Sequence, residues 1–150
     1  MSDSAELYQQ VILEHNRSPR NYGPLSGATH SAEGDNPLCG DRYTIEIRID
    51  ENDKVAAIGF YGAGCAISKA SASLMTETVT GMSSPDANKL FERFRDLVSS
   101  RLDPADQTEL GKLRVFSGIW EYPARVKCAI LPWHALSSAL AGGDAVTTES

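Results

Sequence analysis

The strongest constraint on the fold is an alternating pattern at residues 43–49, where three isoleucines and a tyrosine are separated by polar or charged residues. Successive side chains of a strand point to opposite faces, so this run predicts a strand with one buried face. A turn at 51–53 and a second strand-like run at 55–61 follow directly. The two runs together predict an antiparallel β-hairpin.

Helical patterns surround this hairpin. Apolar residues recur at the spacing of a one-sided helix in residues 6–16, 66–80 and 84–98, and Ser84-Pro85 has the form of an N-cap followed by proline. The remaining expectations are a strand at 28–33, a short helix at 104–110, a buried loop at 115–116 and a final helix that ends near Leu140. This order predicts an α+β fold, with helices packed on one face of a small antiparallel sheet of about three strands.

The composition narrows the class of protein. The chain has 150 residues, of which 41% are hydrophobic, so we expect a single domain over 1–150 with an ordered core at about 6–141 and frayed ends. Its formal net charge of −6 and the absence of a Lys/Arg run argue against a nucleic-acid partner. No window holds 18 consecutive apolar residues, so we expect no membrane span.

The chain has three cysteines, Cys39, Cys65 and Cys128. An odd number cannot pair completely within one chain, and the acidic N-terminus resembles neither a secretory signal nor a transit peptide. We therefore expect a cytoplasmic protein that uses its cysteines as thiolates. The alternative is that each is a small buried hydrophobic residue. That alternative suits Cys39 and Cys65 poorly, because both lie beside glycines in turn-forming segments.

Asp41 completes a possible ligand set. Residues two apart in an extended segment point the same way, so Cys39 and Asp41 are expected to converge on the core side of the strand entrance. Three thiolates and a carboxylate form a tetrahedral set for zinc, or an incomplete seat for an iron–sulfur cluster. One hard oxygen in place of a thiolate gives a site that can open, which suits transfer chemistry. Asp41 could equally be a simple turn former.

Two of the cysteines are expected at helix starts. Cys65 follows a glycine turn, and the free N–H groups of a helix N-terminus lower the pKa of a thiol. Pro132 inside a helix would clash with the carbonyl of Cys128 at a cost of about 3 kcal/mol, so we expect the last helix to begin near Cys128. Arg125 and Lys127 would then stabilise a thiolate or an added persulfide sulfur. The three histidines show no metal-ligand spacing and are expected at surface or capping positions.

Four motifs in a fixed order resemble the IscU/NifU-like iron–sulfur cluster assembly proteins. They are HNRSPRNYG at 15–23, NPLCGD at 36–41, GAGCAIS at 62–68 and PARVKCA at 123–129. The resemblance spans about residues 7–140. It implies the family fold, which is a small antiparallel sheet with helices packed on it.

Two departures from the IscU pattern resemble the SufU branch of the SUF system. IscU-type scaffolds have a histidine before the third cysteine, where this chain has Lys127, and the Cys65–Cys128 spacing is longer here. The resemblance implies a zinc-dependent sulfurtransferase that takes persulfide sulfur from a SufS-type cysteine desulfurase and passes it toward a SufB-containing assembly complex. The implied zinc ligands are Cys39, Asp41, Cys65 and Cys128.

We expect Cys39 to be the sulfur acceptor, because it lies in a loop beside Gly40, and Arg125 to steady the thiolate or the transferred sulfur. One alternative is a non-catalytic scaffold that holds a [2Fe–2S] cluster through the same four residues. A second alternative is a zinc-stapled adaptor that only docks to a partner.

Overall fold

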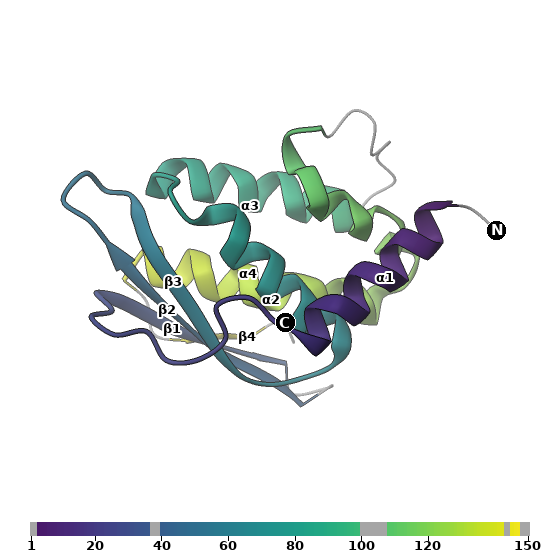
Figure 1. Cartoon of the computed structure of the whole chain (residues 1–150), viewed down its shortest axis with the longest axis horizontal. Coiled ribbons are helices and arrows are strands. Elements are labelled where there is room, and N and C mark those ends of the chain that lie inside the picture. Colours follow the sequence, from purple (N-terminus) through teal and green to yellow (C-terminus); the bar gives the residue numbers. More distant parts are fainter. Residues whose placement is uncertain (1–2, 37–39, 100–107, 143–144, 148–150) are drawn as a thin grey trace.

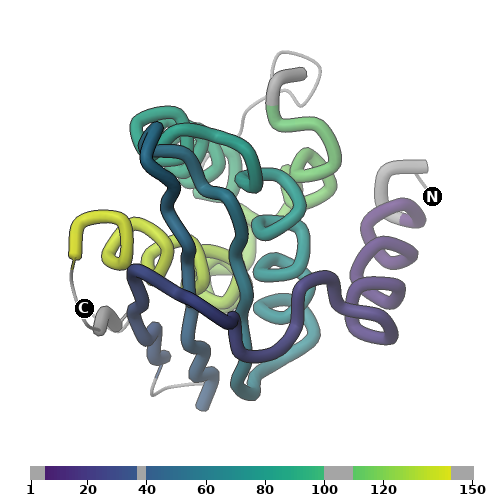
Figure 2. Tube along the Cα trace, turned by 60° about the vertical axis from the view of Figure 1, so that its left-hand side comes forward, coloured from purple at the N-terminus to yellow at the C-terminus, as the bar shows by residue number. Residues whose placement is uncertain are grey.

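The computed structural model describes residues 3–36, 40–99, 108–142 and 145–147. Helices lie on one side of a twisted sheet, and α1 stands at the edge beside α2 (Figures 1 and 2). The elements in chain order are α1 Asp3–Arg17, β1 His30–Asn36, β2 Asp41–Ile49, β3 Val55–Ala63, α2 Ala66–Val79, α3 Ser84–Ser99, η2 Thr108–Glu121, α4 Pro123–Leu140 and β4 Ala145–Thr147. The predicted α+β class, with an antiparallel sheet packed against helices, is confirmed.

The sheet has the strand order β3-β2-β1-β4. β2 pairs antiparallel with both β1 and β3, and Ile45 lies opposite Phe60 in the predicted hairpin. Alternate residues of β2 are buried from Asp41 to Ile47, as the period-two pattern predicted. The buried face of the sheet therefore carries both core side chains and the carboxylate of Asp41.

β4 was not predicted. Residues 142–150 were expected to be frayed, yet Ala145–Thr147 pairs in parallel with β1 beside Glu33–Asp35. Backbone hydrogen bonds to the open edge of β1 hold such a short strand, so its sequence needs no alternating pattern. The strand expected at 28–33 also lies slightly later, at His30–Asn36.

The connection between α3 and α4 differs from the expectation. Residues 115–116 were predicted to form a buried loop, but they lie in η2, a 3₁₀ helix that bends at Gly111. Its buried apolar residues are spaced by three, at Leu110, Leu113, Phe116 and Ile119. A 3₁₀ helix has three residues per turn, so this spacing puts the three that follow the bend, Leu113, Phe116 and Ile119, on one face. The helix expected at 104–110 lies mainly outside the described residues.

The expected start of α4 near Cys128 is wrong. The helix begins at Pro123, which places Cys128 in its second turn and Pro132 in its interior. Pro132 has no N–H to donate to the Cys128 carbonyl, so the helix loses a hydrogen bond there. The buried face of α4 offsets this loss, because it includes Leu131, Trp133 and Leu136. Burying each large apolar side chain contributes about 1.5–3 kcal/mol, so packing outweighs the cost of the proline.

Two smaller expectations also change. α3 begins at Ser84 itself, and the hydroxyl of Ser83 accepts the Asp86 N–H at 3.2 Å, so the cap lies one residue earlier than predicted. His15 was expected at the surface or at a cap, but it is 1% exposed and its Nδ1 lies 2.6 Å from Ser73 Oγ. This contact joins α1 to α2. No helix in the described part of the chain is long and apolar enough to cross a membrane.

Candidate metal centre

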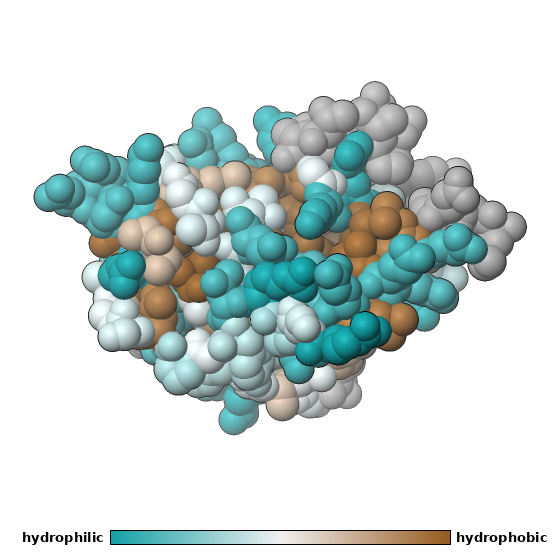
Figure 3. All heavy atoms as spheres, viewed as in Figure 1, coloured by the Kyte–Doolittle hydropathy of each residue, from teal (hydrophilic) through white to brown (hydrophobic). Residues whose placement is uncertain are grey.

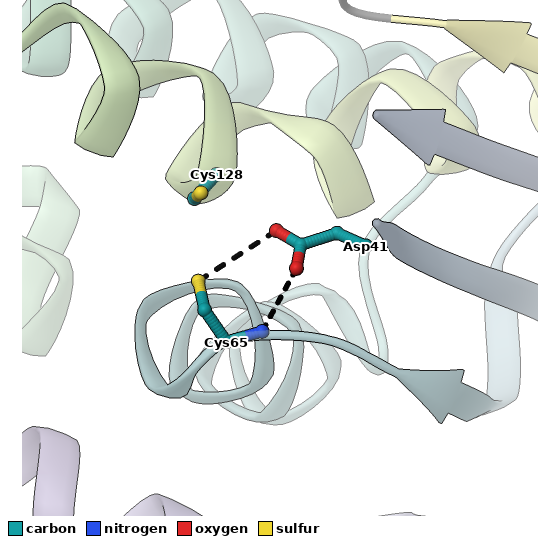
Figure 4. Close-up of side chains that lie close together, drawn as sticks. All are labelled: Asp41, Cys65 and Cys128. Atoms are coloured by element: carbon teal, nitrogen blue, oxygen red, sulfur yellow. Dashed lines mark hydrogen bonds between the residues drawn. The ribbon is translucent and has the colours of Figure 1, made fainter. Parts of the chain in front are cut away.

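Three elements bring Asp41, Cys65 and Cys128 together (Figure 4). Asp41 is the first residue of β2, Cys65 caps the N-terminus of α2, and Cys128 lies in the second turn of α4. One ligand atom from each lies within 4.8 Å of the other two. Asp41 and Cys128 are buried, whereas Cys65 is half-buried. The three side chains form a candidate metal-binding group with one side nearer the surface.

The Asp41 carboxylate is held by α2. Its Oδ1 accepts the backbone N–H of Cys65 at 2.8 Å, and its Oδ2 lies 3.6 Å from Cys65 Sγ. The predicted inward orientation is confirmed, because Asp41 is 1% exposed and shares the buried face of β2 with Tyr43. A buried carboxylate needs hydrogen bonds or a cation to offset the loss of hydration. Only part of that need is met by the N–H of Cys65.

Cys65 occupies the predicted position at a helix N-terminus. Its Sγ accepts the backbone N–H of Ser68 at 3.4 Å, as the N-cap residue of α2. A hydrogen bond from Cys128 lowers the pKa of Cys65 to about 6, and the Ser68 N–H and hydroxyl add to this effect against burial. The same hydrogen bond and burial raise the pKa of Cys128. The hydrogen bond between the two sulfurs therefore favours the thiolate form of Cys65 and the thiol form of Cys128.

Gly64 allows the backbone to approach this group closely. A Cβ at Gly64 would lie 2.7 Å from both Ser68 Oγ and Tyr43 Oη, and 2.8 Å from Asp41 Oδ1. Only a residue without a side chain fits there unless these polar atoms move. Tyr43 Oη in turn accepts a hydrogen bond from Ser68 Oγ at 3.3 Å. Ser68 and Tyr43 were not predicted as site residues, although Tyr43 follows Asp41 in the inward phase of the strand.

The donor set fits a borderline or soft cation. Two sulfurs and a carboxylate oxygen are ligands that zinc and iron take in proteins, and a cation would replace the proton shared by Cys65 and Cys128. The backbone N–H groups of Cys65 and Ser68 donate to two of these ligand atoms, as groups around metal ligands commonly do. The residues present therefore fit a metal ion. The fourth predicted ligand, Cys39, lies outside the described residues.

Arg125 lies at the surface, on the same helix as Cys128. It is exposed in the first turn of α4, with its guanidinium carbon 4.6 Å from the centre of the Tyr122 ring. Arg125 also lines a pocket of about 360 Å³ with Tyr8 and Ile67. Burial raises the pKa of Tyr8, the Arg125 charge opposes that shift, and Cys65 and Cys128 add to it. Two lining residues are close in sequence to the metal-binding group, because Ile67 lies in the first turn of α2 after Cys65 and Arg125 lies one turn before Cys128.

Apolar surface gathers around α1 and the neighbouring η2, whereas the turn between β2 and β3 is hydrophilic (Figure 3). Leu7 and Leu13 of α1 are 51% and 60% exposed, and Leu13 lines the same pocket as Arg125. The helical spacing of α1 predicted its buried side but did not show that leucines also cover its open side. Lys127 is half-buried on α4, immediately before Cys128.

Comparison with known proteins matches residues 7–129 to the NifU-like N-terminal domain. The chain is 38% identical to the iron–sulfur cluster assembly scaffold protein IscU of Streptococcus pyogenes, over 93% of this chain and 86% of that protein. It is also 38% identical to the zinc-dependent sulfurtransferase SufU of Bacillus subtilis, over 90% of each. A solved structure of a SUF-system scaffold protein from Fervidobacterium islandicum has a TM-score of 0.81 at 32% identity, over 91% of this chain and 98% of that one. Because the identity to IscU and to SufU is equal, it does not distinguish a cluster scaffold from a sulfurtransferase. The residues of the site have to make that distinction.

Proposed function

The chain belongs to the NifU-like N-terminal domain family, which includes the iron–sulfur cluster assembly proteins IscU and SufU, and from this premise we propose that it is a zinc-dependent sulfurtransferase of the SufU type. In this proposal Cys39, Asp41, Cys65 and Cys128 hold one zinc ion. The protein accepts persulfide sulfur from a SufS-type cysteine desulfurase and passes it toward a SufB-containing assembly complex. The observation that carries the proposal is the convergence of two cysteine sulfurs and a buried carboxylate within 4.8 Å.

The residue before Cys128 favours zinc over a cluster. Lys127 stands where IscU-type scaffolds have a histidine, and a protonated lysine cannot bind a metal. A fourth ligand must then come from elsewhere, and Cys39 is two residues from Asp41. Zinc, when bound, keeps its cysteine ligands deprotonated near neutral pH.

Cys39 is the proposed acceptor because its neighbour Gly40 borders open space. Gly40 has a positive φ of 75°, and a Cβ there would meet nothing within 4 Å. The Cys39 thiolate attacks the terminal sulfur of the desulfurase persulfide. A sulfur–sulfur bond forms on Cys39 as the one in the donor breaks, and the donor cysteine leaves as a thiolate, so no external oxidant or reductant is needed.

Arg125 is proposed to stabilise the transferred sulfur. It is exposed one helical turn before Cys128, and its side chain ends in a guanidinium cation. A persulfide anion on Cys39 would be attracted to this cation when it reaches the rim of the pocket. Arg125 therefore acts on the charged product of the transfer and is not a metal ligand.

A [2Fe–2S] scaffold is the second candidate function. The equal identity to IscU of Streptococcus pyogenes favours it, and the same two sulfurs and carboxylate suit iron. A zinc-stapled adaptor is a further possibility, and it differs from the first proposal only in lacking sulfur transfer.

Metal analysis, a visible spectrum and desulfurase turnover separate these functions. We expect colourless protein with about one zinc per chain that increases the turnover of a SufS-type desulfurase. Brown protein with iron and sulfide would support the scaffold and contradict the proposal. Normal zinc content without any increase in desulfurase turnover would support the zinc-stapled adaptor and contradict the proposal. Cys128→Ser is the matched control, because it should reduce the zinc content while Cys39 remains in place.

A further inference from the structure

Asn36 is a buried amide whose polar atoms have no partner among the described residues. It is the last residue of β1 and is 0% exposed, and neither Oδ1 nor Nδ2 has a hydrogen-bond partner in the described part of the chain. Most buried polar side chains are hydrogen-bonded, because an unpaired one loses its hydration without compensation. The fold therefore holds this amide in place without gaining anything from its polar atoms.

Register places Asn36 beside the metal-binding group. Asn36 lies directly opposite Asp41 in the β1–β2 ladder, and both face the buried side of the sheet. Side chains directly opposite each other in an antiparallel pair have Cβ atoms about 4.5–5.5 Å apart. The Gly40 N–H donates to the Asn36 carbonyl at 2.8 Å, which fixes the backbone at this end of the ladder.

The helix that carries Cys128 covers the same face of β1. A Cβ at Gly34, two residues before Asn36, would lie 3.2 Å from side-chain atoms of both Leu131 and Ala135. Asn36 therefore lies on the face of β1 that α4 covers, opposite Asp41 in the ladder. Bulk solvent touches neither of its polar atoms, since the whole residue is at 0% exposure.

We propose that Asn36 is a positioning residue of the metal centre, whose Nδ2–H donates to the Asp41 carboxylate when that carboxylate binds a cation. In the structure Asp41 is turned toward Cys65, which holds Oδ1 through its N–H and has its Sγ 3.6 Å from Oδ2. Carboxylates that bind metals are commonly hydrogen-bonded by a neighbouring group, which fixes their orientation. This inference rests on the proposed zinc site.

The proposal predicts that a substitution of Asn36 lowers the affinity for zinc without lowering the stability of the metal-free protein. Asn36→Leu replaces the amide by an apolar group of similar size, so the metal-free protein loses no side-chain hydrogen bond to the described residues and should not be destabilised. Zinc affinity should fall by about 10- to 100-fold, as for other residues that orient a metal ligand. An ordinary structural asparagine would show the opposite pattern.

The test uses the full chain and zinc. Zinc affinity is measured by competition with a chromophoric chelator, and the stability of the metal-free protein by urea denaturation. The variants are Asn36→Leu, Asn36→Ala in case the leucine packs poorly, and Ser73→Ala as control. Ser73 is also fully buried, but its Oγ is bonded to His15 and to the Arg20 N–H, and it lies two helical turns from Cys65.

We expect both Asn36 variants to bind zinc more weakly, with the leucine variant as stable as the unsubstituted protein, and Ser73→Ala to unfold at lower urea with unchanged zinc affinity. Asp41→Ala should remove the effect of Asn36→Leu on zinc, because Asn36 acts through that carboxylate. Unchanged zinc affinity in both Asn36 variants overturns the inference alone, as does a persistent effect in the Asp41→Ala background. An unsubstituted protein that binds no zinc contradicts the proposed function and this inference together.

Discussion

The backbone N–H of Cys65 donates to Asp41 Oδ1 across 2.8 Å, which ties the start of α2 to the start of β2. One residue therefore supplies a sulfur ligand through its side chain and orients a second ligand through its backbone. The geometry of the group depends on the glycine that precedes Cys65, because that glycine lets the turn pass close to the carboxylate.

Gly64→Ala should damage the centre. The new methyl group would lie 2.7–2.8 Å from Ser68 Oγ, Tyr43 Oη and Asp41 Oδ1, so at least one must move. We expect a loss of stability of about 1–3 kcal/mol and at least tenfold weaker zinc binding, measured by denaturation and chelator competition. Gly118→Ala is the control, because a Cβ there meets nothing within 4 Å. Equal stability and equal zinc affinity of the two variants would contradict the close packing of polar atoms around Gly64.

The reactivity of Cys65 should report its lowered pKa. In the metal-free protein its alkylation, followed by mass spectrometry of the Cys65 peptide, should be half-maximal near pH 6, not near the ordinary value of 9.0. The thiolate is the reactive form, so the rate rises as pH rises through the pKa. Cys128→Ala should move the profile to higher pH, because the Cys128 hydrogen bond is the largest cause of the shift. An unmoved profile would show that the two sulfurs do not share a proton.

His15 should make stability depend on pH. Burial, with a smaller contribution from Arg20, lowers the pKa of His15 below its ordinary 6.5. Because the unfolded chain binds this proton more readily, the contribution of His15 is present above pH 6.5 and is lost as pH falls through the folded-state pKa. Urea denaturation at pH 7.5 and 5.5 should show a smaller loss of stability for His15→Gln than for the unsubstituted protein. Burial also lowers the pKa of His134, so this histidine adds the same loss of stability at low pH to the unsubstituted protein and to His15→Gln.

Cys39→Ala should abolish sulfur acceptance. Incubation with a cysteine desulfurase and radiolabelled cysteine should label the unsubstituted protein and leave this variant unlabelled, because the proposed acceptor thiolate is missing. Arg125→Ala should retain the site but accept sulfur more slowly. Full labelling of Cys39→Ala would move the acceptor role to Cys65 or Cys128.

Much of the site could be predicted because it depends on local rules. The period-two pattern from Tyr43 onward placed Asp41 on the buried face, and the glycine turn placed Cys65 at a helix start. Both predictions need only the geometry of one element. The hairpin was predicted for the same reason, since its register follows from a short turn between two adjacent runs.

The remaining features depend on contacts between distant segments. Pro132 argued for a helix that starts near Cys128, but the burial of α4 against the sheet outweighed that local rule. The importance of Asn36 follows from its register with Asp41 and from the covering helix, neither of which has a signal in the sequence. His15 was likewise placed at the surface because its partner Ser73 is 58 residues away.

X-ray absorption at the zinc edge tests the central claim most directly. Cys39, Asp41, Cys65 and Cys128 predict one zinc per chain with three sulfur neighbours at about 2.3 Å and one oxygen at about 2.0–2.2 Å. Protein purified with iron that shows iron–iron scattering, or zinc surrounded mainly by nitrogen and oxygen, would contradict the account.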